Sequence, residues 1–209
     1  MSRLIIYTIA FMTGFAVMGY EILCSRVLIP YYGNTVYIWG SLLAVFMTGL
    51  AIGYTLGGRM ADRFTSRFIL PGLILGPILL FGCFPLYGVF LCKLMFAIRS
   101  APRSGVLLAA IVLCLPPCIF LGCICPYLIK IAVPDMSRVG TLAGNIYSIS
   151  TLGSVAGALF TSFFMISWIG TSKSIQLLAI PLLVNFILCI MVLNISKFIA
   201  IQGKHGIDK

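Results

Sequence analysis

The sequence predicts an all-α polytopic membrane protein with six transmembrane helices in a single domain. The 209 residues are 61% hydrophobic and only 9% charged, whereas a soluble domain of this size carries about 25% charged residues. The apolar residues also form uncharged runs long enough to cross the hydrocarbon layer, for which a helix needs about 20 residues. We expect one transmembrane domain over residues 1–209, with spans at about 4–24, 36–58, 68–92, 104–129, 140–167 and 174–196.

The first apolar run ends at Glu21, the only acidic residue inside a predicted span. The run continues to Arg26 without an Ala-x-Ala cleavage site, so we interpret it as a span and not as a signal peptide. Because a lone carboxylate in hydrocarbon is costly, Glu21 must pair, be protonated or face water. Arg26 is a candidate partner. A role on a substrate or ion path, a structural ion pair and an interfacial position all remain open.

Glycines at four-residue spacing mark the second and fifth spans. Such spacing aligns a groove on one helix face, where another backbone can approach closely. We expect a helix-packing interface, either within one subunit or between two subunits. The glycines concerned are Gly49, Gly53, Gly57, Gly153 and Gly157.

The loop after the second span places Asp62 among Arg59, Arg63 and Arg67. A carboxylate held among guanidinium groups near helix ends can form and break ion pairs as the helices shift. The nearby positive charge favours the ionised carboxylate. We therefore interpret these four residues as a conformational charge cluster and not as a ligand site.

Prolines concentrate in the third and fourth spans, and each one removes a backbone donor and crowds the preceding turn. We expect these two helices to be kinked or broken. A broken helix at membrane depth is tolerated where it is buried in protein or faces water, which fits a substrate path and static curvature equally well. The prolines are Pro71, Pro77, Pro85, Pro116, Pro117 and Pro126.

The fifth span is unusually polar, with Asn145, Ser148, Ser150, Thr151 and Ser154. A lipid-facing helix has no need of so many hydroxyl groups, so this helix should pack against protein or line a cavity. The candidate substrate or ion path comprises Glu21, Arg26, Asn145 and Ser148.

The basic residues indicate an orientation. Nine of the fourteen Lys and Arg residues lie at the two termini and in the second and fourth loops, and five lie on the other side. The positive-inside rule then places both termini in the cytoplasm, and we expect a bacterial inner (plasma) membrane. We interpret the net charge of +10 as this signal, with some contact to anionic lipid of the bilayer, and we expect no nucleic-acid partner.

No cofactor or metal site is expected. The eight cysteines include no Cys-x-x-Cys pair, and His205 is the only histidine, so the usual spacing of metal ligands is absent. Cys114 and Cys118 share a helix face, and we interpret them as small apolar core residues.

The loop pattern Gly58-x-x-x-Asp62-Arg63-x-x-x-Arg67 resembles the signature loop of the major facilitator superfamily, G-x-x-x-D-R-x-G-R-R. The chain departs from that pattern at Thr65 and Ser66. The resemblance implies a facilitator-like half fold, since six spans are half of a twelve-helix facilitator in which two halves enclose a central site. It also implies a cytoplasmic loop and a homodimer or a homologous membrane partner.

Three segments, 14–63, 115–135 and 140–171, resemble the membrane part of spermidine-synthase-like membrane proteins. Those proteins join a facilitator-like domain to a cytoplasmic aminopropyltransferase-like domain. The resemblance implies a transporter-like membrane subunit for a polyamine or related small metabolite, partnered with a separate spermidine-synthase-like protein. The alternatives are a non-transporting scaffold that assembles partner proteins and, less favoured, a subunit of a membrane enzyme. Because the sequence contains no Gly-rich nucleotide-binding unit, we expect no enzyme activity from this chain alone.

Overall fold

The computed structural model describes residues 3–64, 68–98, 102–132 and 139–205, with residues 102 and 193–205 described by their backbone alone. These residues form helices, including one π-helical turn, η2. The elements in chain order are α1 (Arg3–Tyr32), α2 (Val36–Arg63), α3 (Ile69–Gly82), α4 (Phe84–Ile98), α5 (Pro102–Ala132), α6 (Val139–Phe160), η2 (Thr161–Met165), α7 (Ile166–Trp168), α8 (Thr171–Leu177) and α9 (Ala179–His205).

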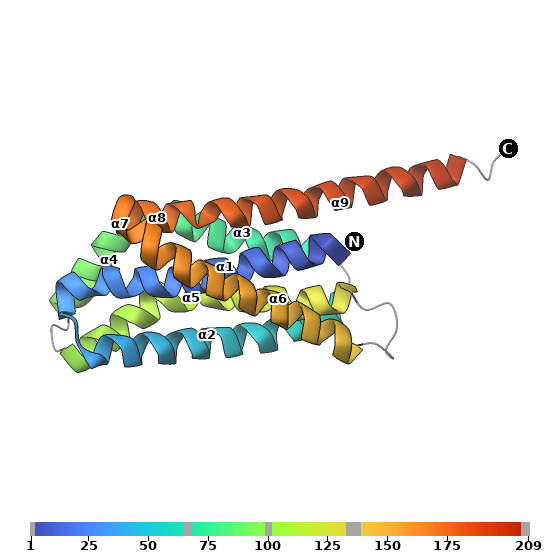
Figure 1. Cartoon of the computed structure of the whole chain (residues 1–209). Helices are drawn as coiled ribbons and strands as arrows, with labels where there is room; N and C mark the ends of the chain where they lie inside the picture. The colour runs from blue at the N-terminus through green and yellow to red at the C-terminus, as the bar shows by residue number, and fades with distance from the viewer. Residues whose placement is uncertain (1–2, 65–67, 99–101, 133–138, 206–209) are drawn as a thin grey trace.

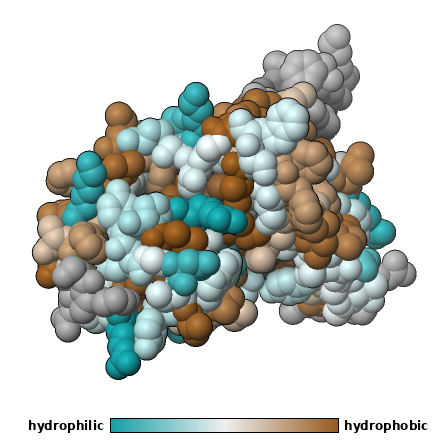
Figure 2. Space-filling view, turned by 60° about the vertical axis from the view of Figure 1, so that its left-hand side comes forward, coloured by the Kyte–Doolittle hydropathy of each residue, from teal (hydrophilic) through white to brown (hydrophobic). Residues whose placement is uncertain are grey.

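The helices form an elongated bundle along one axis (Figure 1). Five segments in the described part of the chain are long and apolar enough to cross a membrane, and α3 with α4 counts as a sixth if this bent pair is one span. Large apolar side chains are also exposed on the outside of the bundle, among them Leu86 (82% exposed) and Met47 (69%). Figure 2 shows hydrophobic residues reaching the surface between scattered hydrophilic ones. The chain is an all-α polytopic integral membrane protein, as predicted.

The first helix is longer than predicted. The predicted span ended near residue 24, whereas α1 continues to Tyr32, and only residues 33–35 separate it from α2. Gly33 makes the turn with a φ of +74°, a conformation that glycine adopts at no steric cost. Charged residues such as Glu21 and Arg26 limit an apolar run but do not end a helix, which explains the difference.

The prolines act differently in the two spans that contain them. The third span is broken at Cys83 into α3 and α4, which are bent by 68°, and Pro85 lies in the first turn of α4, where its missing N–H costs nothing. By contrast, α5 is one helix that contains Pro116, Pro117 and Pro126. The predicted break is therefore confirmed in the third span, while the fourth is unbroken.

Tyr20 lies at the centre of the core. Its side chain is fully buried, and its hydroxyl donates a hydrogen bond to the Leu113 carbonyl of α5 at 2.9 Å. Its ring packs against Phe46 of α2, with centroids 5.8 Å apart, and against Phe81 of α3 at 4.6 Å. One side chain thus joins four helices. Cys114 and Cys118 are also fully buried, in agreement with their predicted role in the core.

The glycines of α2 form a close contact with α5, which runs parallel to it (Figure 1). A Cβ atom added to Gly53 would lie 2.5 Å from the Ile119 carbonyl oxygen, and one added to Gly57 would lie 2.5 Å from the Cys123 carbonyl oxygen. A Cβ on Gly49 would lie 2.7 Å from a Cys118 side-chain atom. Only glycine allows this approach of the two backbones.

The glycines of α6 form the same kind of contact with α1, again between parallel helices. A Cβ on Gly153 would collide with the Phe11 carbonyl, and one on Gly157 with the Phe15 carbonyl. The sequence is compatible with two roles for these glycines, namely packing within one subunit and contact between two subunits. The structure places all five predicted glycines against helices of the same chain, so these faces are not free to contact a second subunit.

Candidate functional site

A cleft of about 290 Å³ opens between α1, α2, α5 and α6. Apolar side chains form most of its wall, and polar groups from three of the four helices are set among them. The polar residues are Thr13 and Glu21 of α1, Tyr54 of α2, and Tyr147, Ser150, Thr151 and Ser154 of α6.

Glu21 is the charged residue of this cleft and is half-buried. It lies eighteen residues after the start of α1 and eleven before its end, or about 27 Å and 16 Å along the helix at 1.5 Å per residue. The helix therefore continues well beyond the predicted span end near residue 24. Its carboxylate faces the cleft within the candidate span α1, and in hydrocarbon an unpaired charge is costly unless water or a cationic ligand reaches it.

Arg26 is not the partner of Glu21. Within the described residues, the only ion pair joins Asp62 and Lys130, and Arg26 is exposed at the surface. Five positions along a helix correspond to a rotation of about 140° beyond one full turn. Arg26 therefore points away from the face on which Glu21 lies, and the Glu21–Arg26 ion pair, one of the alternatives that the sequence left open, is not formed among the described residues.

The α6 side of the cleft presents oxygen atoms. The Ser154 hydroxyl lies 3.2 Å from the Gly14 carbonyl of α1 and 3.1 Å from the Ser150 carbonyl. The Thr151 hydroxyl donates to the Tyr147 carbonyl at 2.8 Å. Since each hydroxyl uses its proton within the protein, its lone pairs remain available to accept a hydrogen bond. This wall therefore suits a ligand that donates hydrogen bonds.

Two tyrosines narrow the far end of the cleft. The rings of Tyr54 and Tyr147 lie edge to face across the gap between α2 and α6, with centroids 6.5 Å apart. Tyr54 is eight residues beyond Phe46, which also lines the cleft and packs against Tyr20, the neighbour of Glu21. Eight residues are about 12 Å of helix. The cleft is thus elongated, with a carboxylate towards one end and aromatic rings at the other.

The other two predicted path residues lie outside this cleft. Ser148 is exposed, and Asn145 lines a separate hollow of about 310 Å³ with Arg3, Tyr7 and Thr141. The α6 residues that do line the cleft follow one helix face at spacings of three and four residues. Positions 145 and 148 lie two residues before and one residue after Tyr147, off that face, so the sequence already contained the signal that would have separated the two groups.

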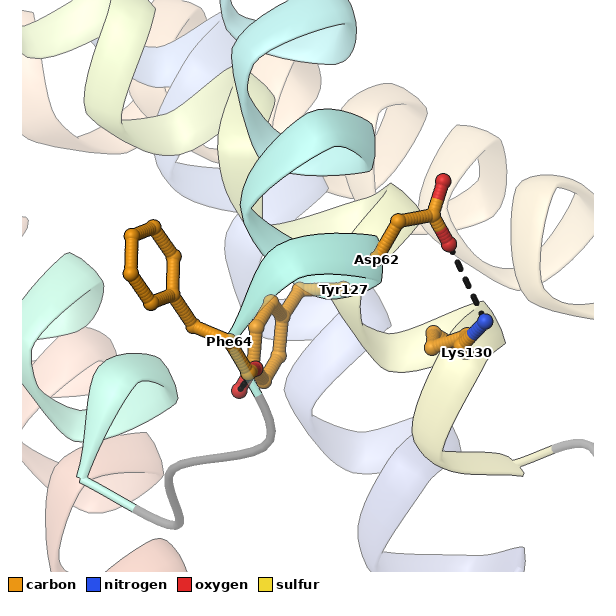
Figure 3. A network of polar contacts seen from close by, with 4 residues as sticks. All are labelled: Asp62, Phe64, Tyr127 and Lys130. Atoms are coloured by element: carbon orange, nitrogen blue, oxygen red, sulfur yellow. Dashed lines mark hydrogen bonds and ion pairs between the residues drawn. The ribbon is translucent and has the colours of Figure 1, made fainter.

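The charge cluster takes a different form from the predicted one. Asp62 Oδ1 lies 3.0 Å from Lys130 Nζ of α5 (Figure 3), and neither Arg59 nor Arg63 pairs with Asp62 among the described residues. Arg67 lies outside the described residues. Lys130 lies 68 positions from Asp62, so no local pattern in the sequence links the two residues.

A second contact lies beside this ion pair. The Tyr127 hydroxyl of α5 donates a hydrogen bond to the Phe64 carbonyl at 3.5 Å, just after the end of α2 (Figure 3). The two contacts join the C-terminal ends of α2 and α5. We call Asp62, Lys130, Tyr127 and Phe64 the α2–α5 clamp.

Comparison with known proteins returned no family model, no curated protein and no solved structure that matches this chain. The function is therefore inferred from the geometry of the cleft and from the residues themselves.

Proposed function

We propose that the chain is a transporter-like membrane subunit, and that the Glu21 cleft is part of the path of a small organic cation. The observation that carries this proposal is the half-buried Glu21 carboxylate, which faces an open cleft within the candidate span α1 and has no ion-pair partner among the described residues. An ionisable residue in this setting is costly to keep, and such residues usually mark substrate or ion paths.

The chemistry of the wall favours an elongated amine, which is consistent with a polyamine or related small metabolite. The Glu21 carboxylate attracts an ammonium group. Tyrosine rings such as those of Tyr54 and Tyr147 attract a second cationic group through their faces. The hydroxyl oxygens of Thr151 and Ser154, which lie in the α6 wall, accept hydrogen bonds from N–H groups between the two ends.

A membrane partner would complete this path. Apolar residues on both sides of the cleft are exposed, with Met47 of α2 at 69% and Leu152 of α6 at 60%. A second copy of the chain, or a homologous half, would cover them and close the cleft as in facilitators with two halves. The motif resemblance adds a separate spermidine-synthase-like protein as a partner.

The proposed orientation has both termini in the cytoplasm of a bacterial inner membrane. The start of α1 and the ends of α2 and α5 lie at the same end of the bundle (Figure 1), and these helix ends carry Arg3, Arg59, Arg63 and Lys130. Reporter fusions in the third loop and at Lys209 test the orientation. A periplasmic signal from the fusion at Lys209 would contradict it.

Uptake by reconstituted vesicles tests the function. Proteoliposomes that contain the purified chain should accumulate radiolabelled spermidine, and Glu21→Gln should reduce the initial rate at least tenfold because the cation loses its counter-charge. Ser148→Ala, on the same bundle but outside the cleft, should transport like the wild type. Equal uptake by the Glu21→Gln and wild-type proteins would overturn the proposal. Absence of uptake, together with co-purification of a partner protein, would favour the scaffold instead.

A further inference from the structure

A crevice of about 520 Å³ lies on another face of α1, where the end of α6, η2, α8 and the start of α9 meet it. Every residue that lines it is apolar; Phe11, Phe15, Phe160, Met165, Leu177 and Val184 are examples. Because the crevice lies on the outside of a transmembrane bundle, it opens towards lipid and not towards water. Its lack of polar groups also distinguishes it from the Glu21 cleft.

The crevice is part of a built framework. The π-helical turn η2 supplies Met165 to its wall, and the Ser174 hydroxyl of α8 lies 3.1 Å from the Met165 carbonyl. Next to the crevice, α1 packs tightly against η2 and Leu178 at Gly19. A Cβ added there would lie 2.9 Å from Thr161 Oγ1 and 3.0 Å from a Leu178 methyl group. The backbone contacts around η2 thus fix the shape of the crevice without filling it.

A cation and an exposed aromatic residue lie close in sequence to residues that line the crevice. Lys173 is one helical turn before Leu177 on the same face of α8, since residues four apart are neighbours on a helix. It is exposed and has no ion pair within the described residues. Trp168, 84% exposed, ends α7 and directly precedes Ile169, which lines the crevice. Tryptophan and lysine at the end of a span are typical of the membrane–water interface.

We propose that this crevice binds one acyl chain of a phospholipid, whose phosphate group lies on Lys173. The acyl chain contacts the apolar wall beside Phe11 and Val184. The Lys173 ammonium group binds the negatively charged phosphate at the level of the headgroups. An empty crevice would forfeit dispersion contacts along its whole lining, and the acyl chains of the bilayer are the molecules that surround it. The site is structural or regulatory and does not depend on the proposed transport.

Native mass spectrometry tests the site on the whole chain released from micelles that contain palmitoyl-oleoyl-phosphatidylglycerol. The wild type should retain one tightly bound lipid. Val184 lines the crevice and is 40% exposed. Val184→Trp should fill the crevice and abolish that adduct. Ile187→Trp should not, because Ile187 is exposed on the same helix but does not line the crevice.

The headgroup contact has its own matched pair of variants. Lys173→Gln should lower the occupancy about fivefold, as expected from the loss of one cation near an anionic headgroup. Lys93→Gln, an exposed lysine of α4, should leave it unchanged. Equal lipid retention by Val184→Trp and Ile187→Trp would overturn the proposal. A loss of dimer mass in Val184→Trp with unchanged lipid would assign the crevice to a second copy of the chain.

Discussion

The α2·α5 pair and the α1·α6 pair use the same packing device in different surroundings. Both consist of parallel helices that approach through glycines four residues apart. Yet α5 is also covered by α1, α3 and α4, whereas α6 packs mainly against α1. Over its most apolar 18 residues, α5 is 56% buried, while the corresponding stretch of α6 and the segment after it is only 22% buried.

The difference shows that glycine spacing determines how closely two helices approach. The spacing does not determine what role a helix pair has in the protein. The α2·α5 contact is made by backbone and apolar side-chain atoms around Gly49, Gly53 and Gly57, and it ends in the α2–α5 clamp. The α1·α6 contact includes the Ser154 bond to Gly14 and carries the hydroxyl groups of the cleft on its edge. One pair is a central support, and the other contributes most of the polar groups of the cleft.

The largest effect is expected from Gly53→Leu in the central pair. A side chain there meets the backbones of Ile119 and Gly122, at 2.5 Å and 2.8 Å from its Cβ, and backbone cannot move aside cheaply. We expect a loss of more than about 3 kcal/mol of stability, seen as aggregated protein in fluorescence-detected size-exclusion chromatography. Gly58→Leu is the control, because nothing lies within 4 Å of its Cβ. Equal elution profiles of the two variants would show that the contact is loose.

A smaller effect is expected from Gly153→Leu in the peripheral pair. Its Cβ would collide with the Phe11 carbonyl, but α6 has few neighbours on its outer side and can shift outwards. We expect a loss of about 1–3 kcal/mol, measured as a lower thermal midpoint in detergent. Gly144→Leu, which has open space around it, should match the wild type. If Gly153→Leu is as damaging as Gly53→Leu, the two pairs are equally constrained, and the comparison fails.

Much of the fold follows from local features of the sequence. The uncharged runs predicted the spans, and the proline-rich third span predicted the break that the structure shows between α3 and α4. The glycine spacing predicted close contacts but could not name the partner helix, because Gly53 meets Gly122 through packing of residues far apart in the chain. The end of α1 was predicted too early from its charged residues, because Arg26 is compatible with a helix at the membrane surface.

The candidate site was predictable only in part. Glu21 stood out as a lone carboxylate in an apolar span, and the polar character of α6 indicated a wall. The pairing of Asp62 with Lys130 and the contact of Tyr54 with Tyr147 join residues more than sixty positions apart. No local spacing encodes such contacts, so they require the packed bundle.

A modest effect is expected from Ser154→Ala, which tests whether the α1·α6 pair depends on its polar contact. The variant loses the hydrogen bond to the Gly14 carbonyl and keeps the helix contact itself. Hydrogen bonds between transmembrane helices contribute about 0.6 kcal/mol on average, so the thermal midpoint should fall only slightly. Thr8→Ala is the control, since the Thr8 hydroxyl bonds to Leu4 of its own helix. A loss as large as that of Gly153→Leu would mean that the serine, and not the glycine, holds the pair together.

The smallest effect on stability, and the sharpest test of the central pair, is expected from Asp62→Asn. The side chains of Asp62 and Lys130 are 72% and 59% exposed, and exposed pairs contribute about 0–1 kcal/mol. The thermal midpoint should therefore barely change. A conformational equilibrium, however, is separated by only a few kcal/mol and responds to small differences between its states. If the α2–α5 clamp biases such an equilibrium, its loss should alter access to the cleft.

Thiol labelling reports that access within one protein. Cys125 of α5 lines the cleft and is 5% exposed, whereas Cys83 is exposed at the α3–α4 bend and serves as the internal reference. Asp62→Asn should change the labelling rate of Cys125 relative to Cys83, and Arg59→Gln, which removes a charge outside the clamp, should not. The charge exchange Asp62→Lys with Lys130→Asp should restore the wild-type rate, because it rebuilds the ion pair with its sign reversed. Identical labelling in the wild type and Asp62→Asn would reduce the loop to an orientation signal and leave the α2·α5 pair as a purely static support.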